Sequence, residues 1–293
     1  FEASFRRDVR RMKRWIRMGL FFNPRLRKVG NPIGLLAHIE DYTLRELNLL
    51  NEIDGRNQLI AKSKAIEAHF SMPKLKFPKM WEELSNQHIL VMEEITHPTL
   101  EKHLENNTLT WPDMLELFRI HGAFMFGLGT FHGDLHPGNA MMDDEGNFHF
   151  IDTGAICNAP EHVRNALFGF FYFLAKGDLK NAFDAMLTMA AVRPEGKTLQ
   201  TYYDSMTELY DGFVGTSVSE VSLTEQMMKT VKAAVLAGCA FGEEAFPIIR
   251  SLMYMDGMVL KGHPDVDLIS SMGPYLDEFS VLIDPNSIVQ ADS

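Results

Sequence analysis

The residues best suited to chemistry occupy two short stretches, the block 132–139 (His-Gly-Asp-Leu-His-Pro-Gly-Asn) and the triplet 152–154 (Asp-Thr-Gly). The residues between them read as two short strands joined by a tight turn, because the turn sequence Asp-Asp-Glu-Gly-Asn is made mostly of residues that tolerate turn geometry. This hairpin predicts that Asp152 returns beside Asn139 and Asp134. Two carboxylates and one amide oxygen suit Mg²⁺, which takes a few such ligands together with phosphate oxygens and water.

The order and spacing of these three polar residues match a template for phosphoryl transfer. In that template one Asp accepts the proton of the attacking hydroxyl group, and an Asn five residues later and an Asp after a hairpin hold the metal ions. Here the three residues are Asp134, Asn139 and Asp152. A glycine-rich turn with solvated carboxylates is the alternative, but such a turn does not need the second Asp-x-Gly.

Helices must hold these loops in place. The pattern predicts a helix over 112–129, with Thr110 as its cap and Pro112 near its first turn. His121 within it is expected to be a core histidine. A short helix is predicted near 99–105. After Gly154 the chain reads as almost wholly helical, with Pro274 among the residues that mark boundaries or kinks. The predicted helices are 159–175, 178–191, 198–213, 222–240, 244–260 and 273–280.

The N-terminal third predicts three further elements. Residues 3–20 read as a basic amphipathic helix, which fits either an anionic lipid surface or the protein's own acidic surface. A long helix is predicted over 35–62. Its Glu46 and Glu52 are six residues apart, about 240° around the helix, so one of them could meet a lysine in a nucleotide cleft or both could lie on the surface. Residues 87–93 read as a buried strand that leads into a hinge.

Composition limits the possible classes of protein. The chain has 293 residues, 46% of them hydrophobic, and a net charge of −11, so nucleic acid is not the expected partner. Residues 1–28 carry ten Lys or Arg and two Asp or Glu, a net +8, whereas the remainder carries a net −19.

Two distant cysteines favour a reducing compartment. Eight methionines in the predicted C-terminal helices favour adaptable core packing, with a lipid groove as the alternative, and they are Met186, Met189, Met206, Met227, Met228, Met253, Met255 and Met258. We expect no membrane-spanning helix and no signal peptide, and the first residue, Phe1, suggests a piece of a longer protein.

These motifs together resemble the UbiB/ADCK (aarF-type) family of atypical protein-kinase-like proteins. The block 132–139 and the triplet 152–154 resemble its catalytic and metal-binding loops, 46–52 its helix motif, 90–93 its hinge and 250–265 its C-terminal helical part. The resemblance implies an α+β, mostly helical, protein-kinase-like fold with a truncated N-terminal lobe and a helical C-terminal lobe. Residues 1–95 would be the remnant of the first lobe and residues 96–293 the second.

The same resemblance implies roles for individual residues. Asp134 would be the catalytic base, and His132 and His136 would belong to the catalytic loop, where His136 either contacts the γ-phosphate or fixes the loop. Asn139 and Asp152 would bind Mg²⁺. The cofactor ATP would be bound through residues of the helix and the hinge. In this set Glu52 pairs with the ATP-binding lysine, Glu46 pairs with a regulatory lysine, and Met92 and Glu93 form the hinge. The family is tied to ubiquinone and other isoprenoid-lipid metabolism in mitochondria, plastids and bacteria.

Some residues depart from the family pattern. Asn48 stands where the family usually has Asp, and Thr153 replaces the Phe of Asp-Phe-Gly. The alanine-rich nucleotide loop, the strand lysine and the Lys-x-Gly-Gln motif are not found in these 293 residues, so we expect the covered piece alone to be inactive. Gly133 replaces an arginine that many protein kinases use to read a phosphorylated activation loop. Almost no activation segment follows Gly154, which favours a small-molecule or lipid-linked phosphotransferase, or an ATPase.

Three other functions remain open from the sequence. An aminoglycoside- or choline-kinase-like phosphotransferase shares the block 132–139. A metal hydrolase could use His132, Asp134, His136 and His149, although this leaves Asn139 and Asp152 unexplained. A lipid-binding pseudokinase scaffold is the third. For the preferred function we expect ATP and an isoprenoid lipid or lipid-biosynthesis proteins as partners, and an intracellular location at a peripheral membrane surface in a mitochondrion, plastid or bacterial cytoplasm.

Overall fold

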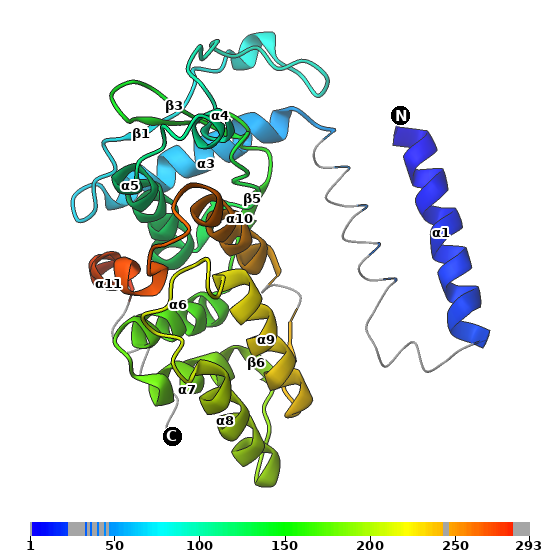
Figure 1. Cartoon of the computed structure of the whole chain (residues 1–293). Helices are drawn as coiled ribbons and strands as arrows, with labels where there is room; N and C mark the ends of the chain where they lie inside the picture. The colour runs from blue at the N-terminus through cyan, green and yellow to red at the C-terminus, as the bar shows by residue number, and fades with distance from the viewer. Residues whose placement is uncertain are drawn as a thin grey trace. The chain divides into compact units, whose positions relative to one another are not determined.

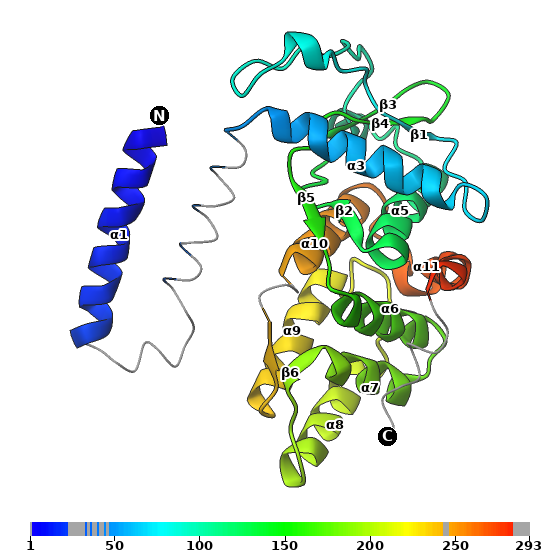
Figure 2. The same cartoon turned by 180° about the vertical axis from the view of Figure 1, so that it is seen from behind.

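The computed structural model describes residues 2–22, 47–242 and 246–283, and four single positions, Ile33, Leu36, Glu40 and Leu44. The described chain is mostly helical with small sheets, and Figures 1 and 2 show it from two sides. It forms two compact units. The first contains Phe1–Asn57, Lys79–Glu93 and Asp152–Ala155, and the second contains Gln58–Pro78, Glu94–Ile151 and Ile156–Ser293. Each unit is described by itself.

Helices build most of the second unit, and Figures 1 and 2 show α6 and α7 side by side. The helices are α4 (Leu100–Glu105), α5 (Trp111–Gly122), α6 (Glu161–Ala175), α7 (Leu179–Met189), α8 (Lys197–Tyr210), α9 (Leu223–Leu236), α10 (Phe246–Gly262) and α11 (Leu268–Phe279), with short 3₁₀ turns at Glu82–Leu84 in the first unit and Ser280–Leu282 in the second. The predicted helices near 99–105 and from 159 to 260 are therefore confirmed.

The predicted start of the last helix at residue 273 was wrong. Helix α11 begins at Leu268, because the side chain of Asp267 caps it by accepting a hydrogen bond from the backbone of Ser270. Pro274 lies inside the helix rather than at its boundary. A proline there removes one helical hydrogen bond, and the helix continues because its buried face, which includes Met272 and Leu276, stays packed.

Helix α5 leads directly into the candidate site. Its N-terminus carries the predicted Thr110 cap as part of a capping box, in which the Thr110 and Asp113 side chains each accept a backbone hydrogen bond from the other residue. The helix continues as a π-helical segment (Ala123–Leu128), so the prediction of a helix over 112–129 is confirmed. Gly129 ends it with φ 67°, a left-handed conformation that favours glycine.

The predicted hairpin is present. Strands β3 (Ala140–Met142) and β4 (Phe148–Phe150) are antiparallel, with Ala140 opposite Phe150 and Met141 opposite His149. Strand β1 (Leu75–Lys76) adds to β4 in parallel. Two further pairs of strands are antiparallel. Strand β2 (Thr130–His132) pairs with β5 (Ile156–Asn158), and β6 (Ala190–Val192) pairs with β7 (Ala240–Phe241).

The core of the second unit is rich in phenylalanine and methionine. One face of the hairpin enters it, because Phe148 and Phe150 are buried and His149 between them is half-exposed. The prediction of methionine core filling is confirmed for six residues, Met186, Met189, Met206, Met227, Met255 and Met258. It is wrong for Met228 and Met253, which are exposed. None of the helices that the structure describes is long and apolar enough to cross a bilayer.

The predicted helix over 35–62 is interrupted. The first unit contains α1 (Glu2–Phe22), which confirms the predicted helix 3–20, and the beginning of α3 (Leu50–Ile66). Residues 47–49 are not helical. The side chain of Asn48 accepts a hydrogen bond from the backbone N–H of Leu50 at 3.3 Å, and asparagine in this role caps a new helix. Of residues 35–46, only Leu36, Glu40 and Leu44 are described.

The predicted buried strand over 87–93 was wrong. This segment folds back along residues 79–81, with the Trp81 N–H bonded to the Val91 carbonyl and the Glu93 N–H to the Lys79 carbonyl. The Asn86 N–H bonds to the Ile89 carbonyl across the turn, and the Ile89 side chain is 55% exposed. An apolar run predicts burial only if other elements cover it, and this short ladder leaves Ile89 uncovered.

Candidate functional site

The candidate loop 132–139 connects β2 to β3 in the second unit. Its backbone is held by its own turns, because the His136 N–H bonds to the Asp134 carbonyl at 2.7 Å and the Asn139 N–H to the His136 carbonyl at 2.8 Å. The first turn of α4 adds a contact from outside, where the Glu101 N–H donates to the Pro137 carbonyl at 3.0 Å. The loop is therefore fixed between a sheet and a helix.

Asp134 and Asn139 lie together within this loop. The Asn139 side-chain nitrogen donates to the Asp134 carbonyl at 2.9 Å and lies 3.5 Å from the Asp134 Oδ2. Because the nitrogen of the amide faces Asp134, its oxygen points to the other side. An amide oxygen presented in this way is the kind of ligand that Mg²⁺ takes.

Two residues of α10 hold the loop from a distant part of the sequence. The Tyr254 hydroxyl donates to the Asp134 Oδ1 at 2.7 Å. The Arg250 guanidinium donates from Nε and Nη2 to the Gly133 carbonyl at 3.1 and 2.7 Å. Residues four apart share one face of a helix, so the two side chains act on the loop together. Neither contact is predicted from the sequence, in which the four-residue spacing of Arg250 and Tyr254 is the only signal of a shared role.

The two loop histidines differ in exposure. His132 is fully buried, its Nδ1 accepts a hydrogen bond from the Asp134 N–H at 3.2 Å, and its ring meets Phe150 edge to face. His136 is exposed, its Nδ1 accepts from the Gly138 N–H at 3.1 Å, and its ring is nearly perpendicular to that of Tyr254. When neutral, each ring therefore carries its proton on Nε2. Only His136 has a surface that a ligand could touch.

A second set of predicted residues meets within the first unit. The Glu52 Oε2 accepts a hydrogen bond from the Thr153 N–H at 2.6 Å, and the Thr153 hydroxyl donates to the Glu52 carbonyl at 2.7 Å. Gly154 lies so close that a Cβ there would collide with the Glu52 carboxylate. Burial, followed by repulsion from the Asp152 carboxylate, raises the pKa of Glu52 to about 7. Glu52 and Asp152 thus share one electrostatic environment.

The remaining predicted cofactor residues are more dispersed. Glu46 lies outside the described residues. Met92 pairs with Met80, and the Glu93 carboxylate accepts a hydrogen bond from the Lys79 N–H at 3.0 Å. The predicted site residues therefore form two groups. His132, Asp134, His136 and Asn139 lie in the second unit, and Glu52 and Asp152 in the first.

The residues of the metal-hydrolase alternative do not come together as a group. In the described part of the chain, the histidines and carboxylates whose ligand atoms converge are His97, Asp143 and His149. His149 bonds to Asp143 through its Nε2 at 3.1 Å, whereas the buried His132 packs on Phe150.

The chain is similar in sequence to known proteins. Residues 1–186 match the model of the ABC1 atypical kinase-like domain. Two relatives bear the name probable protein kinase UbiB. The one from Pasteurella multocida is 21% identical over 87% of this chain and 49% of its own length, and the one from Aeromonas salmonicida is 24% identical over 95% and 51%. The Arabidopsis thaliana protein ACTIVITY OF BC1 COMPLEX KINASE 3, chloroplastic, is 24% identical over 86% of this chain and 35% of its own length.

A solved structure supports the same fold. The complex of Rv3197 with erythromycin from Mycobacterium tuberculosis aligns with a TM-score of 0.50 and 15% sequence identity, over 90% of this chain and 69% of that one. The predicted mostly helical, kinase-like fold is therefore confirmed. The chain spans about half the length of the UbiB relatives that it matches.

Proposed function

Because the chain belongs to the ABC1 atypical kinase-like family, which contains the UbiB and ADCK-type proteins, we propose that the intact protein is a Mg-ATP-dependent atypical kinase or ATPase. The observation that carries this proposal is the bonding within the loop 132–139. There Tyr254 holds one oxygen of Asp134, while the Asn139 side chain turns its nitrogen toward Asp134 and its oxygen away. This arrangement fits a base and a metal ligand five residues apart.

The proposal gives each described loop residue a role. Asp134 accepts the proton of the attacking hydroxyl group or orients a water molecule. Asn139 and Asp152 supply oxygens to Mg²⁺, which when bound would neutralise charge on the phosphates. The exposed His136 is free to contact a phosphate oxygen, whereas the fully buried His132 positions the loop.

The N-terminal residues complete the proposed nucleotide site. In this proposal Glu46 and Glu52 are partners of lysines, Met92 and Glu93 form the hinge, and residues 1–95 and 96–293 correspond to the two lobes of a kinase. The raised pKa of Glu52 supports its role, because a lysine ammonium beside this carboxylate would relieve the burial and the repulsion from Asp152.

The proposed acceptor is a small molecule or a lipid-linked compound, with water as the acceptor in an ATPase. Only six residues separate Gly154 from the start of α6 at Glu161, so there is little chain from which to build a platform for a peptide substrate. The UbiB relatives support a role in ubiquinone or other isoprenoid-lipid metabolism, and the Arabidopsis relative is chloroplastic by name. We place the activity at a membrane surface inside a bacterium or organelle.

The test is made on the intact protein by measuring ATP turnover and nucleotide-dependent thermal stabilisation. Asp134→Asn should lower turnover by roughly 10²–10⁴, the usual contribution of a general base, with little change in nucleotide affinity. Asp152→Ala should abolish the part of the stabilisation that requires Mg²⁺. A protein that binds Mg-ATP normally but never hydrolyses or transfers phosphate would instead be a pseudokinase scaffold. Unchanged stabilisation in Asp152→Ala would remove Asp152 from the metal site.

A further inference from the structure

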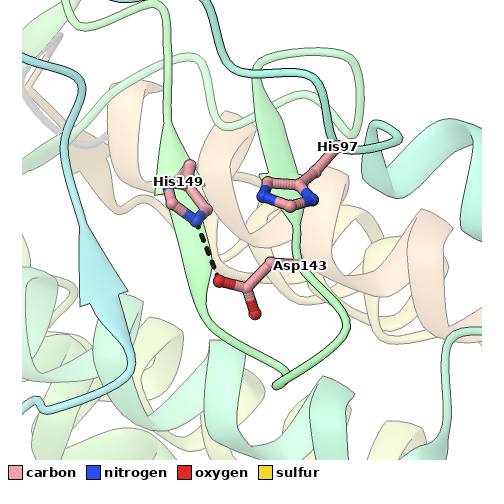
Figure 3. A group of neighbouring side chains, drawn as sticks. All are labelled: His97, Asp143 and His149. Atoms are coloured by element: carbon pink, nitrogen blue, oxygen red, sulfur yellow. Dashed lines mark hydrogen bonds and ion pairs between the residues drawn. The ribbon is translucent and has the colours of Figure 1, made fainter.

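A second group of potential metal ligands lies beside the hairpin, away from the loop 132–139. It consists of His97, which precedes α4, Asp143 at the turn and His149 on β4. Figure 3 shows the two rings and the carboxylate turned toward one another. The His149 Nε2 lies 3.1 Å from the Asp143 Oδ2, and the ring centroids of His97 and His149 are 5.5 Å apart. One ligand atom from each residue lies within 4.8 Å of the others.

The backbone register explains why these side chains meet. Met141 lies opposite His149 in the β3–β4 pair, and Thr99 pairs with Met141 on the other side of β3. The Met142 N–H also bonds to the Pro98 carbonyl, so residues 97–99 run along β3 as an added strand. Residues two apart on a strand point to the same face. His97, Asp143 and His149 therefore occupy the half-exposed face of the hairpin, opposite the core.

Neighbouring groups keep the carboxylate of Asp143 ionised and hold its orientation, and both effects favour binding of a cation. Burial raises its pKa, but hydrogen bonds from the Asn147 side chain and backbone, from His149 and from the Glu145 N–H outweigh this and hold the pKa well below its usual range. The Asn147 side chain reaches the Asp143 Oδ2 at 2.9 Å, and its backbone N–H reaches Oδ1 at 2.8 Å. Such outer contacts orient a ligand.

We propose that His97, Asp143 and His149 form a binding site for Zn²⁺ or a similar transition-metal ion, with water as the fourth ligand. Two imidazoles and a carboxylate are typical ligands of zinc, whereas Mg²⁺ prefers oxygen alone. Bonds of about 2.0 Å in a tetrahedral site separate ligand atoms by about 3.3 Å. The Asp143 Oδ2 and the His149 Nε2 are already 3.1 Å apart, and the ion would take the place of the proton that His149 shares with Asp143, which is released to solvent on binding. Small rotations of side chains that are not fully buried would bring His97 into place.

The proposed ion would tie the added strand 97–99 to the turn of the hairpin. Binding of this ion does not depend on nucleotide or on the proposed kinase activity, because the ligands of the ion are separate from Asp134, Asn139 and Asp152. Its role would be structural. Strand β3 begins directly after Asn139, so an ion at this face would restrain the strand that follows that residue.

The experiment is a titration of the untagged 293-residue chain with Co²⁺ alone, without Mg²⁺ or nucleotide, followed by displacement with Zn²⁺. We expect one ion per chain and the intense visible absorption of tetrahedral Co²⁺. His97→Ala and His149→Ala should each weaken binding at least about tenfold, because loss of even an outer-shell partner of a metal ligand costs about that much. The matched controls are His69→Ala and His88→Ala, which remove exposed histidines outside the cluster and should leave the affinity unchanged.

His97→Ala is the decisive variant, because it leaves the hydrogen bond between His149 and Asp143 intact and should fold normally. Circular dichroism of the metal-free variants verifies the fold. The proposal is overturned if Co²⁺ gives only the weak spectrum of a six-coordinate ion, if the titration shows no binding, or if His97→Ala binds as tightly as the wild type. A loss shared equally by the His69 and His88 controls would also overturn it.

Discussion

At the residue scale, Glu52 is a buried carboxylate placed beside a second carboxylate. Its pKa is raised from about 4.5 to about 7, first by burial and then by repulsion from Asp152, although hydrogen bonds from the backbone N–H groups of Thr153 and Gly154 lower it in part. Between these two pH values the folded state holds a proton that the unfolded state has lost. Since stability rises with pH only where the unfolded state binds more protons, the free energy of unfolding should fall as the pH rises through this window.

Glu52→Gln tests this directly, because glutamine keeps an oxygen for the Thr153 N–H but carries no charge. We expect the variant to be more stable than the wild type by about 1–2 kcal/mol at pH 8, a value discounted for the partial exposure of Glu52. The difference should be mostly lost near pH 4.5, where the wild-type Glu52 is protonated in the folded state and half protonated in the unfolded state. Urea unfolding between pH 4.5 and 8 measures it. Glu67→Gln, at an exposed position, is the control, and a gap that stays constant with pH would contradict the argument.

Tyr254 is the residue that fixes the orientation of Asp134. Its hydroxyl donates at 2.7 Å, so Tyr254→Phe removes one bond and leaves the ring against His136. A hydrogen bond of about 1.5 kcal/mol corresponds to about a tenfold change, and we expect a fall of that size in the ATP turnover of the intact protein. Nucleotide affinity should not change. Tyr275→Phe, in contact with Phe118, is the control. If both variants retain full turnover, Tyr254 has no part in positioning Asp134.

At the scale of elements, the N-terminal cap of α5 should control the stability of the second unit. Thr110→Ala removes the acceptor for the Asp113 N–H and breaks the capping box, and such losses cost about 1 kcal/mol. Denaturant unfolding should show this decrease. Thr201→Ala is the matched control, because Thr201 is exposed within α8 and its replacement should be nearly neutral. Equal effects of the two substitutions would show that the cap contributes nothing specific.

The elements that were predicted well are those whose signals are local. The capping residues and apolar spacing of α5 to α10 are contained within each segment, and so is the polar turn of the hairpin. The wrong predictions arise where a contact with a neighbouring residue or segment determines the local structure. Asn48 caps a new helix instead of continuing the old one, and Asp267 starts α11 ahead of Pro274. The run 87–93 has the composition of a buried strand, but it forms only isolated bridges with the segment around Lys79–Trp81 and across its own turn in the described part of the chain, and Ile89 stays exposed.

The same distinction applies to the candidate site. The residues of the loop 132–139 are contiguous, so a motif identifies them. Tyr254 lies 120 residues beyond Asp134, and no local sequence pattern predicts that its hydroxyl group reaches the Asp134 carboxylate. Likewise, His97 and His149 meet only through the register of three strands. The sequence predicts which residues can do chemistry, whereas the side chains that orient them depend on packing between distant segments.

At the scale of the whole molecule, charge is strongly segregated. The chain has a net charge of −11, yet residues 1–28 carry +8. In α1 the residues Arg6, Arg7, Arg10, Arg11, Arg14 and Arg17 are all exposed. At about 100° per residue they cover one side of the helix, opposite Val9 and Ile16. Trp15 is 68% exposed near the edge of the apolar side, and the helix also forms an ion pair between Lys13 and Glu40 at 2.6 Å.

This helix should bind an anionic membrane surface without crossing it. Each basic residue near such a surface contributes about 1 kcal/mol, and the attraction fades within a Debye length. Vesicles that contain an anionic phospholipid should therefore sediment with the protein at low salt and lose it as salt rises, whereas neutral vesicles should not retain it. The exposed Trp15 can add apolar contact at the interface, as amphipathic surface helices do.

The charge reversals Arg10→Glu, Arg14→Glu and Arg17→Glu, made together, decide whether α1 carries this binding. Loss of three attractive contacts is worth about 3 kcal/mol, so the triple variant should bind anionic vesicles about 100-fold more weakly. The control reverses Lys62, Lys64 and Lys197, which are exposed outside α1 and change the net charge by the same amount. If the control loses binding equally, the attraction depends on overall charge. If the α1 variant binds like the wild type, the basic face serves contacts within the protein, as the Lys13–Glu40 pair already does.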